Sequence, residues 1–354
     1  MGDSIALTID KRIQQLAYEE LHNLVDKFNP CGVSIIVSDV ATGEILALVN
    51  YPEYDPNNYG KYPLENMKNL AVCNIYEPAS VFKIVAMSFG LEYNLVNEGT
   101  IFDCTIPTAM NRGRNIKLPK DHTPFDKITF VDAMRKSSNR AAAFTALMIG
   151  EQQFFECVKS YGFGEKAGYG FDGESAGILF PPSKWDAMTI TRMAMGHAIG
   201  IVPLQAHCAM SVIANNGILL RPNIFRSISD NDTDIVTIHP TIKRRVISQN
   251  TSERMRNVMH NPNNGTLPSG IKFGGKSGTG QKLFNGKYSH DRHTSSYSGF
   301  FPVDNPQIVI TVIVDDAHVQ RGIAWGSTVS LPTFKALAER IVQYLDLNSN
   351  LKKQ

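Results

Sequence analysis

Hydrophobic residues recur every three or four positions between Ile13 and Phe28, directly after Asp10. This period marks one face of an α-helix, and an aspartate before the first turn is a preferred helix cap. Two β-branched runs follow at 32–38 and 44–49, separated by the polar sequence D-V-A-T-G. The pattern predicts an amphipathic helix followed by a β-hairpin.

The pattern becomes mainly helical from Ser80 to about residue 215, with loops that contain Pro and Gly between the helical stretches. Strand-like runs return at 271–282, 296–303 and 307–314. Apolar spacing near the end then predicts a last helix, from Pro332 to Leu347.

We therefore expect an α/β (α+β) fold in one domain, residues 1–354, with an antiparallel five-stranded sheet flanked by helices. Residues 1–78 and about 216–354 would carry the sheet. Residues from about 79 to 215 would form an inserted, mainly helical subdomain. A crevice between sheet and insert is a favoured place for a ligand site.

Composition supports a folded globular protein, because 43% of the 354 residues are hydrophobic and 19% are charged. The net charge is only +2 and the basic residues are scattered, so we expect no nucleic-acid partner. The five cysteines are far apart and form no C-x-x-C pair, and the sequence does not tell which of them, if any, are paired. They are Cys31, Cys73, Cys104, Cys157 and Cys208.

Ser80 and Lys83 are the first candidate pair for chemistry. Pro78 suits the approach to a helix start, and residues three apart on a helix share a face, so the Lys83 amine is expected beside the Ser80 hydroxyl. A lysine can activate a serine only if burial or a nearby cation lowers its pKa from about 10.4. Alone, this spacing more often marks a helix-capping serine and a solvated lysine.

A second candidate is Ser137-Ser138-Asn139, in a break between two helical stretches. A hydroxyl and an amide could project from this break into the crevice. Alone, such a tripeptide is more often a helix-capping turn.

The third candidate is the segment Lys276-Ser277-Gly278-Thr279, inside a glycine-rich predicted strand. Glycines in a strand suit the close approach of a ligand's backbone, and the segment offers one charge and two hydroxyls to an anionic ligand. The spacing from Gly270 also matches a phosphate-binding loop, but no helix is predicted to follow it.

His290 and His293 could share a metal ion if they were on a helix, but no carboxylate or third histidine is suitably spaced to complete a site. We expect these histidines in a surface loop. The sequence predicts no metal site and no cofactor.

The order S-x-x-K, S-x-N, K-[ST]-G is that of β-lactamases and penicillin-binding proteins. The chain resembles the transpeptidase domain of class B penicillin-binding proteins over nearly its whole length. The stretches that carry the likeness beyond the three motifs are L-T-I-D-K-R-I-Q-Q, A-T-G-E-I-L-A-L-V-N-Y-P, Y-E-P-A-S-V-F-K, Y-G-F-G-E-K-A-G and I-V-P-L-Q.

The resemblance implies a peptidoglycan D,D-transpeptidase that cross-links stem peptides through a serine acyl-enzyme and is acylated by β-lactams. The serine would attack the carbonyl between two D-alanines, and the backbone N–H groups of Ser80 and Thr279 would form the oxyanion hole. The implied catalytic set is Ser80, Lys83, Ser137, Asn139 and Lys276, and the implied substrate-binding set is Ser277, Gly278 and Thr279.

The family also implies features outside this segment: an N-terminal anchor in the inner membrane, a non-catalytic domain, and a catalytic domain on the periplasmic or extracellular side. Implied partners are D-Ala-D-Ala stem peptides, β-lactams, a cell-wall glycosyltransferase and division or elongation proteins. Ala79 stands where relatives often have Gly, Ser277 where they often have Thr, and residues 105–120 match nothing in the family pattern. A β-lactam sensor domain and a serine β-lactamase are the alternatives.

Overall fold

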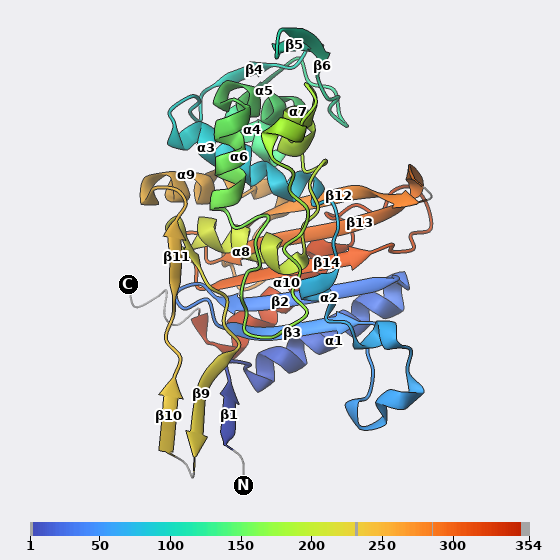
Figure 1. Ribbon diagram of the computed structural model, residues 1–354, viewed down its shortest axis with the longest axis vertical. Helices are drawn as coiled ribbons and strands as arrows, with labels where there is room; N and C mark the ends of the chain where they lie inside the picture. The colour runs from blue at the N-terminus through green and yellow to red at the C-terminus, as the bar shows by residue number, and fades with distance from the viewer. Residues whose placement is uncertain (1–2, 231–232, 285, 348–354) are drawn as a thin grey trace.

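A twisted five-stranded sheet lies at the centre of the computed structural model, which describes residues 3–230, 233–284 and 286–347 (Figure 1). Neighbouring strands are antiparallel, in the spatial order β12-β13-β14-β2-β3. This confirms the predicted α/β (α+β) class and its antiparallel sheet. The strands are β2 (Gly32–Asp39), β3 (Ile45–Tyr51), β12 (Gly274–Phe284), β13 (Lys287–Phe301) and β14 (Ile308–Asp315).

Each face of the sheet belongs to a different hydrophobic core. Ile35 and Val37 of β2 pack with helices α1 (Lys11–Phe28) and α10 (Ser330–Tyr344), whereas Ile36 packs on the side of α8 (Pro203–Ala214). Successive strand residues point to opposite faces, so a strand buried on both faces is apolar throughout. The sheet is therefore the middle layer between two layers of helices (Figure 1).

The helical lobe lies above the sheet in Figure 1. The region predicted to be mainly helical also contains four short strands, paired as β4 with β7 and β5 with β6. Besides α1, α8 and α10, the α-helices of the described residues are α2 (Leu70–Cys73), α3 (Lys83–Glu92), α4 (Phe130–Arg135), α5 (Asn139–Ile149), α6 (Glu151–Ser160), α7 (Thr189–Ala194) and α9 (Gln249–Met259). The four short strands are β4 (Ile101–Asp103), β5 (Thr108–Asn111), β6 (Arg114–Lys117) and β7 (Lys127–Thr129).

The β12–β13 hairpin is longer than the sequence predicted. Strand β13 already begins at Lys287 rather than near residue 296, so His290 and His293 lie in a strand and not in a surface loop. The side chain of His293 is only 4% exposed, which corrects the expectation for that residue. Two smaller sheets lie apart from this hairpin. One contains β1 (Ser4–Leu7), β9 (Phe225–Asp230) and β10 (Thr233–Thr237), and the other contains β8 (Ile218–Leu220) and β11 (Ile242–Arg245).

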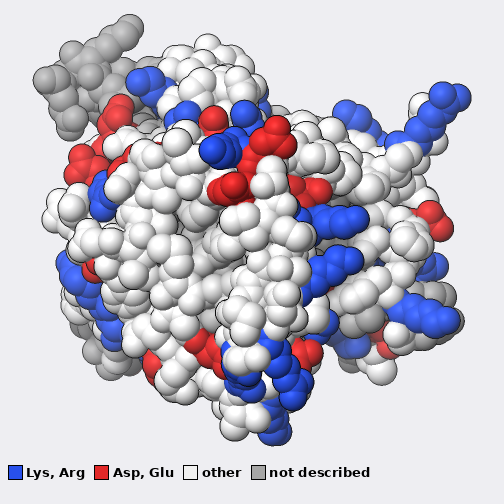
Figure 2. All heavy atoms as spheres, turned by 90° about the horizontal axis from the view of Figure 1, so that it is seen from above, with Lys and Arg blue, Asp and Glu red and all other residues white. Residues whose placement is uncertain are grey.

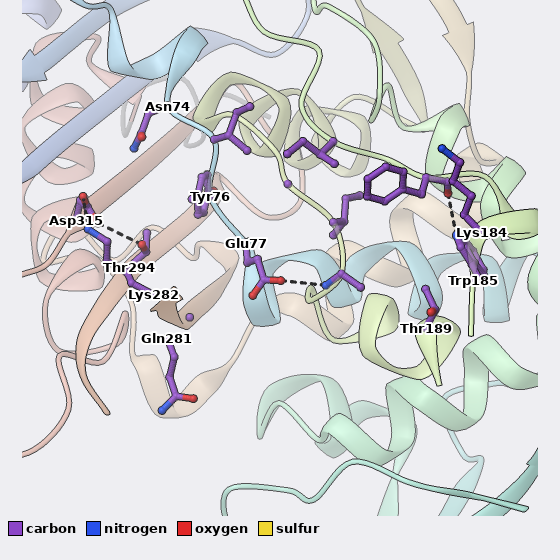
Figure 3. A pocket seen from close by; sticks show the side chains of 17 residues that line it. Asn74, Tyr76, Glu77, Lys184, Trp185, Thr189, Gln281, Lys282, Thr294 and Asp315 are labelled. Carbon is purple, nitrogen blue, oxygen red and sulfur yellow. Dashed lines mark hydrogen bonds and ion pairs between the residues drawn. The ribbon is translucent and has the colours of Figure 1, made fainter. Parts of the chain in front are cut away.

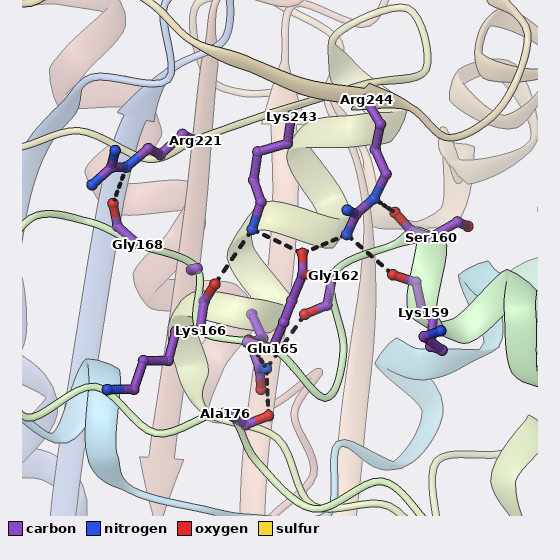
Figure 4. Close-up of polar contacts among 12 residues, drawn as sticks. Lys159, Ser160, Gly162, Glu165, Lys166, Gly168, Ala176, Arg221, Lys243 and Arg244 are labelled. Carbon is purple, nitrogen blue, oxygen red and sulfur yellow. Dashed lines mark hydrogen bonds and ion pairs between the residues drawn. The ribbon is translucent and has the colours of Figure 1, made fainter. Parts of the chain in front are cut away.

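A polar network joins the lobe to β11 and uses two of the stretches that carried the family resemblance (Figure 4). The Gln205 amide donates to the carbonyl oxygens of Glu165 (2.9 Å) and Ala176 (3.0 Å). The Glu165 carboxylate pairs with Lys243 at 2.8 Å and with Arg244. These contacts fix the course of the loop between α6 and residue 178.

Seen from above the lobe, acidic and basic side chains surround a largely uncharged middle (Figure 2). Neither sign of charge dominates this face. No helix among the described residues is both long and apolar enough to cross a bilayer.

Candidate active site

Ser80 lies in a single turn of 3-10 helix, Ala79–Phe82, that leads directly into α3. Its neighbour Ala79 has a left-handed backbone with φ of 48°. Gly196 packs so closely against this turn that a Cβ atom there would lie 2.1 Å from the Ala79 carbonyl oxygen. Ala79 N–H donates to the Gly196 carbonyl oxygen at 3.1 Å. The turn is thus held from outside, which accommodates a conformation unusual for alanine.

Lys83 is buried at the start of α3, with 1% of its surface exposed. Its ammonium donates to three oxygens of the second motif: Ser137 O at 2.5 Å, Ser137 Oγ at 3.1 Å and Asn139 Oδ1 at 2.6 Å. Within the described residues, no hydrogen bond joins it to Ser80. The predicted Ser-x-x-Lys pair therefore shares a turn, while the lysine is committed to the second motif.

Burial holds the pKa of Lys83 well below its usual value, because a charged amine is costly away from water. The nearby Lys276 ammonium lowers the same pKa further, and the Asp121 carboxylate opposes both effects. The amine can thus be neutral much closer to neutral pH than an exposed lysine. A neutral buried amine is the form that can accept a proton from a hydroxyl.

Asp121 is a site residue that the motifs did not reveal. Its carboxylate accepts hydrogen bonds from Ser138 Oγ (3.0 Å), the Arg140 N–H (3.1 Å) and the Asn139 N–H. Ser138 in turn caps α5 by accepting from the Ala141 N–H. The carboxylate therefore fixes the turn that presents Ser137 and Asn139 to the lysine.

The third motif lies on β12, the strand at the edge of the sheet that faces the Ser80 turn. Gly278 has no room for a side chain, since a Cβ there would lie 2.8 Å from the Pro78 carbonyl oxygen. Thr279 Oγ1 accepts from the Gly326 N–H at 2.9 Å. The predicted glycine requirement thus arises first from packing between β12 and the Ser80 turn.

Lys276 is 5% exposed, and burial lowers its pKa to about 7. Its ammonium donates to the Ser277 carbonyl oxygen at 2.9 Å. It lines a cavity of about 220 Å³ behind the motifs and does not line the cleft in front of Ser80. Ser277 and Ser137 line both spaces, so they form the wall between them.

The cleft in front of Ser80 has a volume of about 460 Å³. It combines residues from the lobe, the sheet and the loop after β14. His122 and Trp325 approach each other across it, with ring centroids 4.5 Å apart. The predicted site residues that line it are Ser80, Ser137, Asn139, Ser277 and Thr279, and those that sequence reasoning missed include Lys120, His122, His293 and Trp325.

No group of three or more potential metal-binding side chains occurs within residues 3–230, 233–284 and 286–347. The cleft offers the Ser80 hydroxyl, three further motif hydroxyls and the Asn139 amide, and the buried Lys83 amine bonds to Ser137 and Asn139 in its wall. This set can transfer an acyl group through serine.

A family model for the penicillin-binding protein transpeptidase domain matches residues 33–339. "Stage V sporulation protein D" of Bacillus subtilis is 30% identical over 339 residues, covering 94% of this chain and 52% of the relative. "Probable peptidoglycan D,D-transpeptidase PenA" of Neisseria flavescens is also 30% identical, covering 94% of this chain and 81% of the relative. The chain thus spans about half the length of the Bacillus subtilis relative and 81% of the length of the Neisseria flavescens relative.

The fold agrees with solved structures of the same domain. The transpeptidase domain of penicillin-binding protein 3 from Burkholderia pseudomallei superposes with a TM-score of 0.81 at 28% identity, covering 96% of both chains. Penicillin-binding protein 3 from Mycobacterium tuberculosis, in its apo form, gives 0.85 at 26% identity, covering 98% of this chain and 80% of that one. This chain belongs to the transpeptidase domain family of penicillin-binding proteins, and within it to class B.

Proposed function

We propose that this chain is a serine-type peptidoglycan D,D-transpeptidase and that Ser80 is its nucleophile. The observation that carries the proposal is the buried Lys83, whose pKa is lowered and whose amine is held by Ser137 and Asn139 next to the Ser80 turn. The relative from Neisseria flavescens is named as a probable enzyme of this kind.

In the proposed first half-reaction, Ser80 Oγ attacks the carbonyl carbon between two D-alanines while the neutral Lys83 amine takes its proton. The Ser137 hydroxyl, 3.1 Å from that amine, can pass the proton on to the departing D-alanine nitrogen. Asn139 orients the lysine and the peptide. The absence of a ground-state bond between Ser80 and Lys83 is compatible with this role, because catalytic hydrogen bonds often shorten only once substrate is bound.

The edge position of β12 suits a peptide substrate, because an edge strand can pair with an extended peptide. We assign Ser277, Gly278 and Thr279 to substrate binding, with the two hydroxyls on the terminal carboxylate. Lys276 stands behind them and carries a positive charge when it is protonated, below a pKa of about 7. Ser80 stands second in its helical turn, so its N–H needs no partner within the turn. This N–H and that of Thr279 would stabilise the oxyanion.

The proposal extends to the surroundings of the whole protein. Stem peptides and β-lactams would occupy the site, and a cell-wall glycosyltransferase with division or elongation proteins would act beside it. Because peptidoglycan lies outside the cytoplasmic membrane, we place the catalytic domain on the periplasmic or extracellular side of an anchored protein.

Intact-mass analysis after incubation with benzylpenicillin tests the assignment. A stable one-to-one adduct is expected on the unaltered chain and on a Ser183→Ala control, which removes an exposed serine. The adduct should vanish in Ser80→Ala. No adduct on the unaltered chain would refute the acyl-enzyme, and fast release of hydrolysed drug would indicate a β-lactamase instead.

A further inference from the structure

A second groove of about 520 Å³ lies next to the catalytic cleft (Figure 3). Its middle is apolar and contains Ile75, Ile178 and Phe180, which are 42%, 45% and 51% exposed. Such large apolar side chains around a concave surface are typical of a binding site. Nothing in the proposed acylation step uses them.

The groove and the cleft share one boundary. On β12 the boundary falls between Thr279, which faces the cleft, and Gly280, which faces the groove, and Gln281 lines both spaces. On a second segment His197 faces the cleft and Ala198 the groove. The two spaces are therefore contiguous. A molecule in the groove lies beside the molecule in the cleft.

Glu77 stands at this boundary, three residues before the nucleophile. Its carboxylate accepts from the Ala198 N–H (3.0 Å) and the Tyr288 hydroxyl (3.0 Å) and contacts His197 Nδ1 (2.8 Å). Burial favours the neutral acid, but the His197 ring and these hydrogen bonds outweigh it and lower the pKa of Glu77. An anionic group thus holds the boundary segments together.

The groove wall is preformed. Ile178 pairs with Gly200 through two backbone hydrogen bonds of 2.7 and 3.0 Å, and Tyr76 pairs with Ile201 through two of 2.9 Å. The loop that leads to Ile178 is fixed by the hydrogen bonds of Gln205 and by the ion pair of Glu165 with Lys243, which Figure 4 labels. A ligand would not have to order this wall on binding.

The ends of the groove are polar, as Figure 3 shows on either side of Glu77. On one side Lys282 and Asp315 form an ion pair of 2.8 Å, and on the other stand Lys184 and Thr189. Cations and an anion at the ends, with an apolar middle, suit an extended peptide that has carboxylates, an amine and aliphatic side chains.

We propose that this groove binds the acceptor stem peptide, the second substrate of the cross-linking reaction; the inference rests on the function proposed above. The acceptor's side-chain amine would cross the Glu77 boundary and attack the ester carbonyl on Ser80. Three residues span at most about 11 Å, so a flexible aliphatic amine starting beside Glu77 is within reach of Ser80.

The second half-reaction balances with the groups present. A C–N bond forms between the amine and the acyl carbon, and the ester bond from that carbon to Ser80 Oγ breaks. The proton lost by the amine returns to Ser80 Oγ through Lys83. The products are the cross-linked amide and the free enzyme.

Ile178→Trp tests the groove by filling it from an exposed position, and Leu64→Trp is the matched control, because Leu64 is 75% exposed and outside the groove. The probes are an N-acylated D-Ala-D-lactate ester as donor and a tripeptide ending in L-lysine as acceptor. The ratio of amide formed to ester hydrolysed should fall about tenfold or more in Ile178→Trp. Acylation by benzylpenicillin should stay within about twofold in both variants.

Phe180→Glu puts a charge into the same apolar middle and should lower the ratio of amide formed to ester hydrolysed by the same factor. This second variant keeps the test valid if Ile178→Trp fails to fold. An unchanged ratio in both groove variants would overturn the proposal, and an equal fall in donor acylation would assign the groove to the donor instead. If the unaltered chain is not acylated on Ser80, the proposed function fails first, so the two failures are distinguishable.

Discussion

Lys83 makes the pH dependence of acylation a direct test of its role as the base. The amine must be neutral to accept the Ser80 proton, so the acylation rate should rise with pH as the ammonium loses its proton. Because burial and Lys276 lower the pKa of Lys83, the rate should level off well below pH 10.5. The second-order rate constant for benzylpenicillin, measured from pH 5 to 10, gives this profile.

Lys83→Arg is the control, since a guanidinium stays protonated throughout this range. The variant should lose about a hundred- to ten-thousandfold in rate and keep no pH-dependent rise. A profile that climbs only near pH 10.5 in the unaltered chain would assign the base to another group.

Asp121→Asn should separate the two effects of this carboxylate. An amide cannot accept all three hydrogen bonds that Ser138, Asn139 and Arg140 donate, so the turn should loosen at a cost of about 1–3 kcal/mol in unfolding free energy. Removing the negative charge also lowers the pKa of Lys83 further, because Asp121 raises it. The acid limb of the acylation profile should therefore move to lower pH while the plateau falls.

Asp126→Asn is the matched control for that variant, because Asp126 is exposed on the same segment. It should change neither the plateau nor the midpoint of the profile. If Asp121→Asn lowers the plateau of the acylation rate but does not move the midpoint of the profile to lower pH, Asp121 has a structural role only.

At the scale of single residues, the spacing in the sequence predicted the members of the three motifs but not the residues that surround and position them. Ser80 and Lys83 lie in one turn, so the three-residue spacing placed them together, but it did not reveal that the Lys83 amine bonds to Ser137 and Asn139. Asp121 bonds to residues 17 to 19 positions away, and His122 meets Trp325 across the cleft. Contacts of this kind depend on how the lobe folds back on the sheet, and local periodicity does not contain that information.

Among the elements, β12 depends on an unusually close approach by the loop after β14. A Cβ on Gly326 would lie 2.3 Å from the carbonyl oxygens of Gly278 and Ser296, so Gly326→Ala must push this loop away from the strand. The Gly326 N–H would then release Thr279 Oγ1. Acylation should fall by about a hundredfold, the effect of a displacement of roughly 1 Å in an active site.

Gly60→Ala is the control for this substitution, because a Cβ on Gly60 would meet nothing within 4 Å. It should leave the benzylpenicillin rate unchanged. An equal rate in Gly326→Ala would show that the loop position does not matter for the third motif.

The regular elements were predictable where one period ran over many residues. Buried strands β2 and β14 and helix α1 follow directly from their apolar patterns. The hairpin of β5 and β6 was missed because its strands have four residues each and Ile116 is the single buried residue among them. The first part of β13 was missed for a similar reason, since residues 287–292 are polar and mostly exposed.

Over the whole molecule, the cleft exists because the chain leaves the sheet after β3, builds the lobe and returns to form β12 to β14. Ser80 lies where the chain passes from the sheet into the lobe, and Ser137 and Asn139 lie in the middle of the segment that forms the lobe. The third motif lies on β12, the edge strand that forms when the chain returns to the sheet. The three motifs therefore meet only once both hydrophobic cores have formed. Acylation is in this sense a reporter of the complete fold.

The two tryptophans of the chain can report on the two spaces separately. Trp325 lines the catalytic cleft beside His122, whereas Trp185 lines the groove, is 5% exposed and donates to the Phe180 carbonyl oxygen at 2.8 Å. Acylation by benzylpenicillin should change the fluorescence of Trp185→Phe, which keeps Trp325, because the bound drug alters the surroundings of that ring. It should change that of Trp325→Phe much less.

A tripeptide ending in L-lysine, added after acylation, should give the opposite pattern and perturb only the variant that keeps Trp185. Ser80→Ala, treated with the same drug, controls for non-covalent quenching. Equal responses of both variants to both ligands would mean that cleft and groove act as one space, which would contradict separate donor and acceptor sites even if cross-linking is observed.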